Sequence, residues 1–149
     1  MTPLSPHFSL EELTFSQIAL RRGIINTPNE AQIGALTRLC VTLLEPARTL
    51  LGVHLHVDSG FRNPEVNRLV GSTAPHSAHL DGRGADIIPI GMDLHDAFAL
   101  VRASSLPFDQ LIIECNAWLH LAIADTDEPT RRDCLTCTGT PGHWTYTHI

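Results

Sequence analysis

The sequence of 149 residues contains no lysine, because all 10 of its basic residues are arginines. Genomic base composition can produce such a bias, so we give it no functional weight. Positive charge is also scarce: 16 acidic residues leave a formal net charge of -6. Nucleic-acid binding usually requires a basic face, and we therefore expect no nucleic-acid partner.

Cysteines and long apolar runs are scarce as well. The 4 cysteines are too few and too scattered for a disulfide framework, and Cys40 and Cys115 lie in apolar runs typical of buried positions. No apolar run approaches the roughly 18 residues that span a membrane, so we expect no membrane insertion. Residues 1–6 lack the charged and apolar regions of a secretory signal, which predicts synthesis in a cytoplasm.

The remaining composition, 43% hydrophobic and 17% charged, suits one folded domain. Its first part predicts helices over residues 9–52. Ser9 begins a capping-box pattern, a second short helix is expected from Ser16 to Gly23, and the longest helix follows Asn29. Pro46 should kink or split that helix, and Gly52 should end it.

The second part, residues 53–125, alternates strand and helix signals. Short helices are expected at 64–70 and 93–103, a loop at 71–84, and strands at 53–58, 85–90, 111–114 and 118–124. Helices followed by a mostly sequential sheet predict the α+β class with an antiparallel sheet. After Asp125 the chain becomes polar and rich in breakers, so residues 126–149 are expected to form an irregular tail.

Two histidines and two carboxylates stand out in the second part. His79 and Asp86 are separated by a turn and the start of a strand, and His120 follows in a later strand. Two imidazoles and one carboxylate are typical of catalytic zinc, because three ligands leave a position open for water or substrate. Glu114 is a carboxylate that can accept the proton that a metal-bound water must lose.

Strand alternation predicts that Glu114 and His120 lie close together. Leu119 and Leu121 occupy one face of their strand and His120 the other, while Glu114 lies opposite Ile113 in the same way. If the two strands pair as a hairpin around Asn116, both polar side chains share one sheet face. A histidine and an aspartate at the spacing of His79 and Asp86 often occur by chance in a sequence. The prediction of a zinc site therefore depends on these two residues together with Glu114 and His120.

The segment from Ser59 to His120 resembles a known family. It contains Ser59-Gly-Phe-Arg62, an asparagine, Ser77-Ala-His79, Asp86 after six intervening residues, Glu114 and Trp118-Leu-His120. This order resembles the zinc D-Ala-D-Ala carboxypeptidases and dipeptidases, which include phage and bacterial peptidoglycan peptidases and share their fold with the hedgehog signalling domain. The element Phe8-Ser-Leu-Glu-Glu-Leu13 resembles the small phage-type branch.

The resemblance implies a role for each matching residue. His79, Asp86 and His120 would bind one Zn²⁺ ion, and Glu114 would be the general base. Arg62 would hold the oxyanion or the terminal carboxylate of the substrate. Ser77 would hydrogen-bond the substrate, and Trp118 would form a wall of the pocket.

The chain departs from some relatives at one position. There the base lies three residues before the last histidine, which is Ala117 in this sequence and cannot carry protons. The base must then be Glu114, or catalysis is impaired. Among the other histidines, His54, His56 and His95 are expected at the surface or in loops, while His76 lies three residues before His79 and is a candidate for substrate contact.

The resemblance therefore predicts a zinc peptidase domain over residues 1–125 that acts on peptidoglycan stem peptides. A monomeric D-Ala-D-Ala carboxypeptidase of phage or prophage origin is expected, reaching the periplasm and cell wall after another factor permeabilises the membrane. Two alternatives remain open: an L-Ala-D-Glu or crosslink endopeptidase, and a non-catalytic binding or virion-structural module of the same fold.

The tail contains a second potential ligand set: Cys134, Cys137, His143 and His148. These residues could bind a structural zinc ion and hold down a tail with little core of its own. Their spacing is shorter than in a zinc finger. A loose tail or a redox pair of Cys134 and Cys137 explains the same residues.

Overall fold

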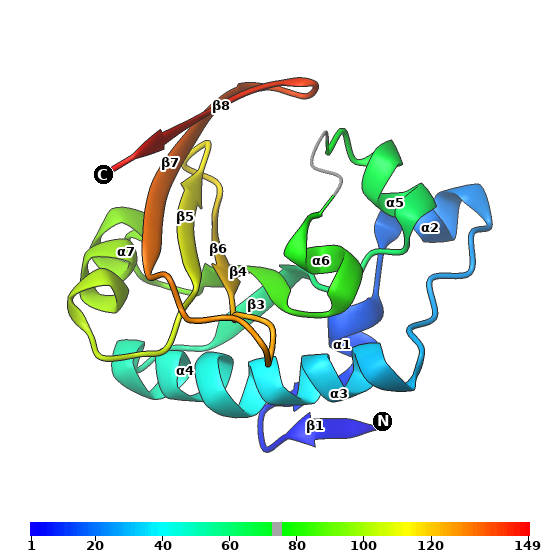
Figure 1. Ribbon diagram of the computed structural model, residues 1–149, viewed down its shortest axis with the longest axis horizontal. Coiled ribbons are helices and arrows are strands. Elements are labelled where there is room, and N and C mark those ends of the chain that lie inside the picture. The colour runs from blue at the N-terminus through cyan, green and yellow to red at the C-terminus, as the bar shows by residue number, and fades with distance from the viewer. Residues whose placement is uncertain (73–75) are drawn as a thin grey trace.

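In the computed structural model, which describes residues 1–72 and 76–149, a six-stranded sheet forms the centre of the fold (Figure 1). Its strand order is β3-β4-β6-β5-β7-β8. The strands are β3 (Leu55–Ser59), β4 (Gly84–Pro89), β5 (Gln110–Glu114), β6 (Trp118–Ala122), β7 (Asp133–Thr140) and β8 (His143–His148). A small N-terminal hairpin joins β1 (Pro3–Ser5) to β2 (Phe8–Ser9).

The expected α+β class is confirmed, but the expected sheet was wrong in two details. The hairpin of β5 and β6 folds back so that β6, not β5, pairs with β4, and the order is therefore not sequential. The chain then crosses to the free side of β5, where β7 runs parallel to it. A mixed sheet results, because the crossing segment returns the chain to the end of the sheet where β5 begins.

The first three helices begin where the sequence predicts. Ser9, Ser16 and Asn29 each accept a hydrogen bond from a backbone N–H in the first turn that follows, and Asn29 forms a full capping box with Gln32. The helices are α1 (Leu10–Thr14), α2 (Gln17–Arg22), α3 (Glu30–Leu39), α4 (Glu45–Leu51), α5 (Pro64–Leu69), α6 (Ala78–Asp81) and α7 (Leu94–Ala103).

Pro46 neither ends the longest helix nor leaves it regular. A π-helical turn, Cys40–Leu44, joins α3 to α4, and the Glu45 N–H donates to the carbonyl of Cys40 five residues earlier. Proline has no N–H for the usual bond to the residue four positions before it, so a widened turn is a fitting place for it. The helix then ends at Gly52, whose φ of 69° suits a residue without a side chain.

The two faces of the sheet differ in character. One face packs against α3, α4 and α7, and its inward side chains form the buried core (Figure 1). The strands contribute to this core chiefly Leu55, Ala85, Ile87, Leu111, Ile113, Leu119 and Leu121. The opposite face holds the side chains between them, including Asp86, Glu114 and His120. Period-two alternation thus separates stability from chemistry.

Residues 126–149 do not form an irregular tail, contrary to expectation. Most of them form β7 and β8, which pair as an antiparallel hairpin. Threonines occupy one face of both strands and pair across it, Thr136 with Thr147 and Thr138 with Thr145. β-branched residues favour strands, and a Pro-Gly turn at Gly142 connects them. The polar composition concealed this alternation.

The loop expected at 71–84 contains the short helix α6, so that expectation was wrong for its last third. Residues 73–75 lie outside the described part of the chain. Within the described part, no helix combines the length and apolarity needed to cross a membrane.

Candidate active site

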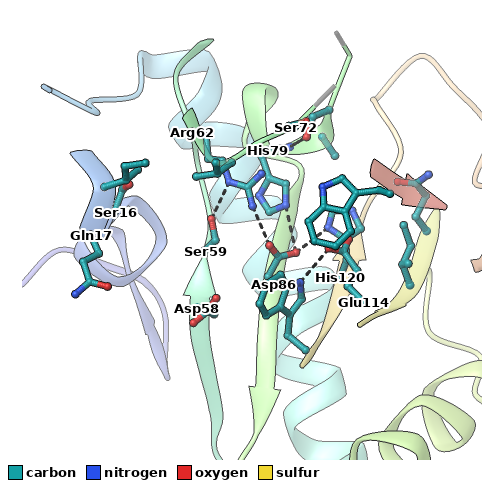
Figure 2. Close-up of a pocket in the computed structure, with 18 of the residues that line it drawn as sticks. Ser16, Gln17, Asp58, Ser59, Arg62, Ser72, His79, Asp86, Glu114 and His120 are labelled. Atoms are coloured by element: carbon teal, nitrogen blue, oxygen red, sulfur yellow. Dashed lines mark hydrogen bonds and ion pairs between the residues drawn. The ribbon is translucent and has the colours of Figure 1, made fainter. Parts of the chain in front are cut away.

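Three buried polar side chains meet on the open face of the sheet (Figure 2). Asp86 on β4 and His120 on β6 are direct cross-strand partners, so the antiparallel register itself brings them together. His79 reaches the same point from α6. Their relative exposures are 4% for His79, 1% for Asp86 and 5% for His120. Such burial of polar groups requires partners, which they find in one another.

One carboxylate oxygen of Asp86 lies between the two imidazoles. Its Oδ1 is 3.3 Å from His79 Nε2 and 3.0 Å from His120 Nδ1. The imidazole ring centroids are 5.0 Å apart and the rings are tilted by 52°. Within the described residues, this trio is the one group of three or more His, Cys, Asp or Glu side chains that could hold a metal ion.

The arrangement of His79 and Asp86 favours the binding of a cation between their side chains. His79 Nδ1 lies 2.7 Å from the carbonyl oxygen of Gly60, which can only accept, so the proton sits on Nδ1. Burial lowers the pKa of His79, and the neutral ring then points the lone pair of Nε2 at Asp86. Burial would raise the pKa of Asp86, but its contacts with His79 and His120 outweigh burial and lower it. A lone pair facing a carboxylate is stable with a cation between them.

The donor set and its spacing fit zinc. Zinc accepts imidazole nitrogen and carboxylate oxygen, and tetrahedral bonds of about 2.0–2.1 Å separate two ligand atoms by about 3.3–3.4 Å. The distances around Asp86 Oδ1 lie close to that separation. His79 also has the outer hydrogen bond to a carbonyl that orients metal-binding histidines. The residues present therefore fit the metal that the sequence predicts.

Arg62 holds the other carboxylate oxygen. Its Nη2 donates to Asp86 Oδ2 at 2.9 Å, its Nε to Ser59 Oγ at 2.9 Å, and its Nη1 to Asn67 Oδ1 at 3.3 Å. Only 12% of the arginine side chain is exposed. The guanidinium therefore fixes the Asp86 carboxylate and compensates its buried charge.

Gly60, the glycine of the Ser-Gly-Phe-Arg segment, lies where no larger residue would fit. A Cβ atom on Gly60 would collide with the carbonyl oxygen of Leu13 in α1, to which the next residue, Phe61, donates its N–H at 2.7 Å. The same glycine presents its own carbonyl to His79. This close approach links the N-terminal helix to the position of a candidate ligand.

Glu114 lies beside the trio on β5, on the same face as His120 (Figure 2). Trp118, its cross-strand partner, donates from Nε1 to Glu114 Oε2 at 3.1 Å. Burial, followed by the charge of Asp86, raises the pKa of Glu114 above its ordinary value. A carboxylate with a raised pKa is suited to accept and return a proton near neutral pH.

The trio and Glu114 open into one cleft of about 640 Å³. One wall comes from α2 and the two residues before it, with Ser16, Gln17 and Arg21 beside the apolar Phe15 and Ile18. The other wall comes from β5 and the C-terminal hairpin. It consists of Gln110, Ile112, Leu135, Trp144 and Tyr146. This size and mixed lining suit a short peptide or a ligand of similar bulk.

A family model described as Peptidase M15 matches residues 6–122, which is most of the chain. The chain belongs to the peptidase M15 family. It is therefore a metallopeptidase, of a family of zinc peptidases that act on peptidoglycan. Comparison with curated proteins gave no significant match. The resemblance inferred from the segment between Ser59 and His120 is confirmed.

The other expected substrate-binding residues of this M15 peptidase line the cleft, and two of them have structural partners. The Ser77 hydroxyl accepts a hydrogen bond from the His79 N–H at 3.3 Å and so caps α6. Trp118 is held by Glu114. His76 is exposed at the cleft. Substrate contact by these three residues stays a prediction.

Several residues were missed from the sequence. Ser59 and Asn67 orient Arg62, and Asn67 proves to be a buried polar side chain inside α5. The sequence shows only an asparagine within an expected helix, which does not reveal its burial. Trp144 and Tyr146 were overlooked because the segment that contains them was expected to be irregular.

The structure, over the residues that it describes, does not form the second metal site that was one option for the tail. Cys134 and Cys137 lie three positions apart on β7, so they face opposite sides of the sheet and join different apolar clusters. The same geometry excludes a redox pair between them. Burial also raises the pKa of Cys137 to about 11, which disfavours the thiolate that zinc requires. His148 instead lies 2.8 Å from Asp133.

Proposed function

We propose that this M15 peptidase is a zinc-dependent D-Ala-D-Ala carboxypeptidase of peptidoglycan stem peptides. The observation that carries the proposal is the convergence of His79, Asp86 and His120 beside Glu114, at the base of a cleft of about 640 Å³. An intact set of this kind also argues against a purely structural role. Membership of the M15 family establishes the peptidase activity. The identity of the cleaved bond is what we propose.

His79, Asp86 and His120 would hold the zinc ion, which supplies Lewis acidity that polarises a carbonyl and lowers the pKa of water to about 7. Glu114 accepts the proton of the attacking water at its carboxylate. It then delivers that proton to the nitrogen of the leaving D-alanine. The raised pKa of Glu114 makes both transfers accessible at neutral pH.

Arg62 serves first as a positioning residue. Three of its five N–H groups donate to Ser59, Asn67 and Asp86. Two N–H groups remain for the terminal carboxylate or the oxyanion of a substrate, since the side chain also lines the cleft. Arg21, on the α2 wall, is a second cation that can attract a terminal carboxylate.

An endopeptidase that cleaves a crosslink or the L-Ala-D-Glu bond is the second candidate. The observation in its favour is that Arg62 donates three of its hydrogen bonds within the protein. Fewer N–H groups than expected are therefore left to bind a free terminal carboxylate. A lysis function in a phage or prophage belongs to the same proposal, with the enzyme made in the cytoplasm and acting on the wall after the membrane is permeabilised. Co-expression with a pore-forming protein should then be required for lysis.

Mass spectrometry of muropeptides tests the bond. Purified murein and free pentapeptide are digested with the zinc-loaded wild type and with Glu114→Gln as the matched inactive control. A carboxypeptidase releases the terminal D-alanine from pentapeptide and leaves crosslinked dimers intact. Cleaved dimers or freed L-alanine would instead identify the endopeptidase. Products equal to those of the control would reject peptidase activity on this polymer.

A further inference from the structure

The C-terminal hairpin of β7 and β8 lies outside residues 6–122, so the family assignment says nothing about its function. The hairpin nevertheless lines the cleft of the candidate active site. In the parallel register, Cys137 lies opposite Glu114 and Leu135 opposite Ile112. The hairpin therefore extends the face of the sheet that carries the site, directly beside the general base.

The outer strand aims two aromatic side chains at this face. Trp144 and Tyr146 alternate with threonines on β8, and Tyr146 is the cross-strand partner of Cys137. Both aromatic residues line the cleft together with Glu114 and His120. Trp144 packs against the buried cluster of Ile112, Leu135 and Cys137, so its ring is held in place.

Tyr146 remains 51% exposed although it lies on the inner face of the hairpin. A half-exposed tyrosine beside an anchored tryptophan offers a large, rigid contact surface at low entropic cost. We name Ile112, Leu135, Trp144 and Tyr146 the hairpin wall.

The chemistry of the hairpin wall favours an apolar peptide residue. Its surface is aliphatic and aromatic, and the nearby indole N–H of Trp118 already donates to Glu114. The polar groups at this wall are the Gln110 side chain and the Tyr146 hydroxyl, which is already hydrogen-bonded to Cys137. Sugar rings carry hydroxyls that need more partners than these. The α2 wall, with Ser16, Gln17 and Arg21, is the more polar side of the cleft.

We propose that the hairpin wall is a specificity site that binds the apolar side chain of a peptide residue flanking the cleaved bond, on the Glu114 side of the cleft. This inference rests on the proposed peptidase function. It assigns the C-terminal hairpin to substrate selection and makes Trp144 and Tyr146 its main contacts.

Binding to an inactive enzyme tests the inference without relying on turnover. In the zinc-loaded Glu114→Gln background, Trp144→Ala and Tyr146→Ala should each weaken binding of the stem pentapeptide about 10-fold or more by calorimetry, as truncation of an anchoring aromatic does. Thr145→Ala is the matched control, because Thr145 lies between them on the outer face and pairs with Thr138. It should bind within twofold of its parent.

Kinetics and altered peptides separate contact from a folding effect. With Glu114 intact, Trp144→Ala should raise KM and leave kcat nearly unchanged, and thermal unfolding should show a folded protein. A peptide with D-serine in place of D-alanine should bind the parent more weakly, yet show no further loss in Trp144→Ala, because the two changes remove the same contact. Additive losses would overturn the inference.

The remaining outcomes are distinguishable. A loss seen only with disaccharide-bearing muropeptides would mean that the hairpin wall binds the sugar, which contradicts the peptide assignment. Wild-type cleavage with unchanged affinity in both aromatic variants would reject the hairpin wall and leave the proposed function intact. If the parent neither binds nor cleaves any stem peptide, the proposed function fails and the inference fails with it.

Discussion

The base of the cleft and its hairpin wall are built by different means. At the base, His79, Asp86 and His120 are almost fully buried, and each is held by a strand register, a capped helix or a buried arginine. The hairpin wall is formed by an outer strand whose residues are mostly exposed. Chemistry that depends on ångström positions uses the buried part, while selection among substrates can use the exposed part. Changes in the two regions should therefore differ in kind as well as in size.

The largest effect is expected at Asp86, where one carboxylate serves both imidazoles and Arg62. Asp86→Ala should abolish zinc binding and activity, measured by elemental analysis and peptide release. It should also destabilise the fold by about 3–5 kcal/mol, because Arg62 is left buried without its partner. Asp86→Asn keeps the shape and separates the two effects.

Chelated wild type is the comparison for this variant. Added zinc should restore the chelated wild type and leave Asp86→Ala inactive. Equal rescue of both would show that Asp86 is not a ligand, and the contrast between base and wall would lose its central residue.

Glu114 lies where the two regions meet. Glu114→Gln should lower kcat by about 10²–10⁴ through loss of the general base. Zinc content and thermal stability should stay unchanged, because the glutamine can still accept the Trp118 hydrogen bond. Near-normal turnover would mean that another group carries the proton.

A smaller effect is expected from the support of the base. Arg62→Lys loses the fork that engages Ser59, Asn67 and Asp86 together, and should weaken zinc affinity by about 10–100-fold, as outer contacts of ligands do. Competition with a zinc chelator measures this change. Arg68→Lys, on the exposed side of α5, is the control. An unchanged affinity would assign Arg62 to the substrate alone.

The smallest effect concerns pH. The rate should fall as pH drops through the pKa of Glu114, because only the ionised carboxylate accepts a proton, and burial raises that pKa. The Trp118 hydrogen bond stabilises the ionised form and so lowers the pKa. Trp118→Phe should therefore shift the acidic limb of the kcat profile to higher pH, by about one unit or less. A shift to lower pH would contradict Glu114 as the base.

Sequence patterns predicted the buried region well, because a strand or helix with one buried face must keep apolar residues at regular spacing. Ser9, Ser16 and Asn29 fixed the helix starts through local hydrogen bonds, and alternation around His120 and Glu114 fixed which face they occupy. The contacts of Arg62 could not be predicted in the same way. They join Ser59, Asn67 and Asp86, residues from three elements, and only the fold determines which acceptors lie within reach.

The hairpin was missed for the opposite reason. β7 buries residues on both of its faces and β8 is mostly exposed, so neither strand shows a simple apolar alternation, and their threonines were taken for irregular structure. The parallel pairing of β7 with β5 is also a long-range event that leaves no local signal. The tail cysteines and histidines suggested a metal by residue type alone, and the strand geometry places Cys134 and Cys137 on opposite faces.

The parallel pairing of β7 with β5 has a consequence for self-association. Without it, β5 would end the sheet with a row of unpaired backbone N–H and C=O groups next to the apolar Ile112, which is a template for other chains. The pairing moves the free edge to β8, which presents Thr145 and Thr147 on its outer face. The hairpin thus keeps the strand that carries Glu114 away from the free edge of the sheet.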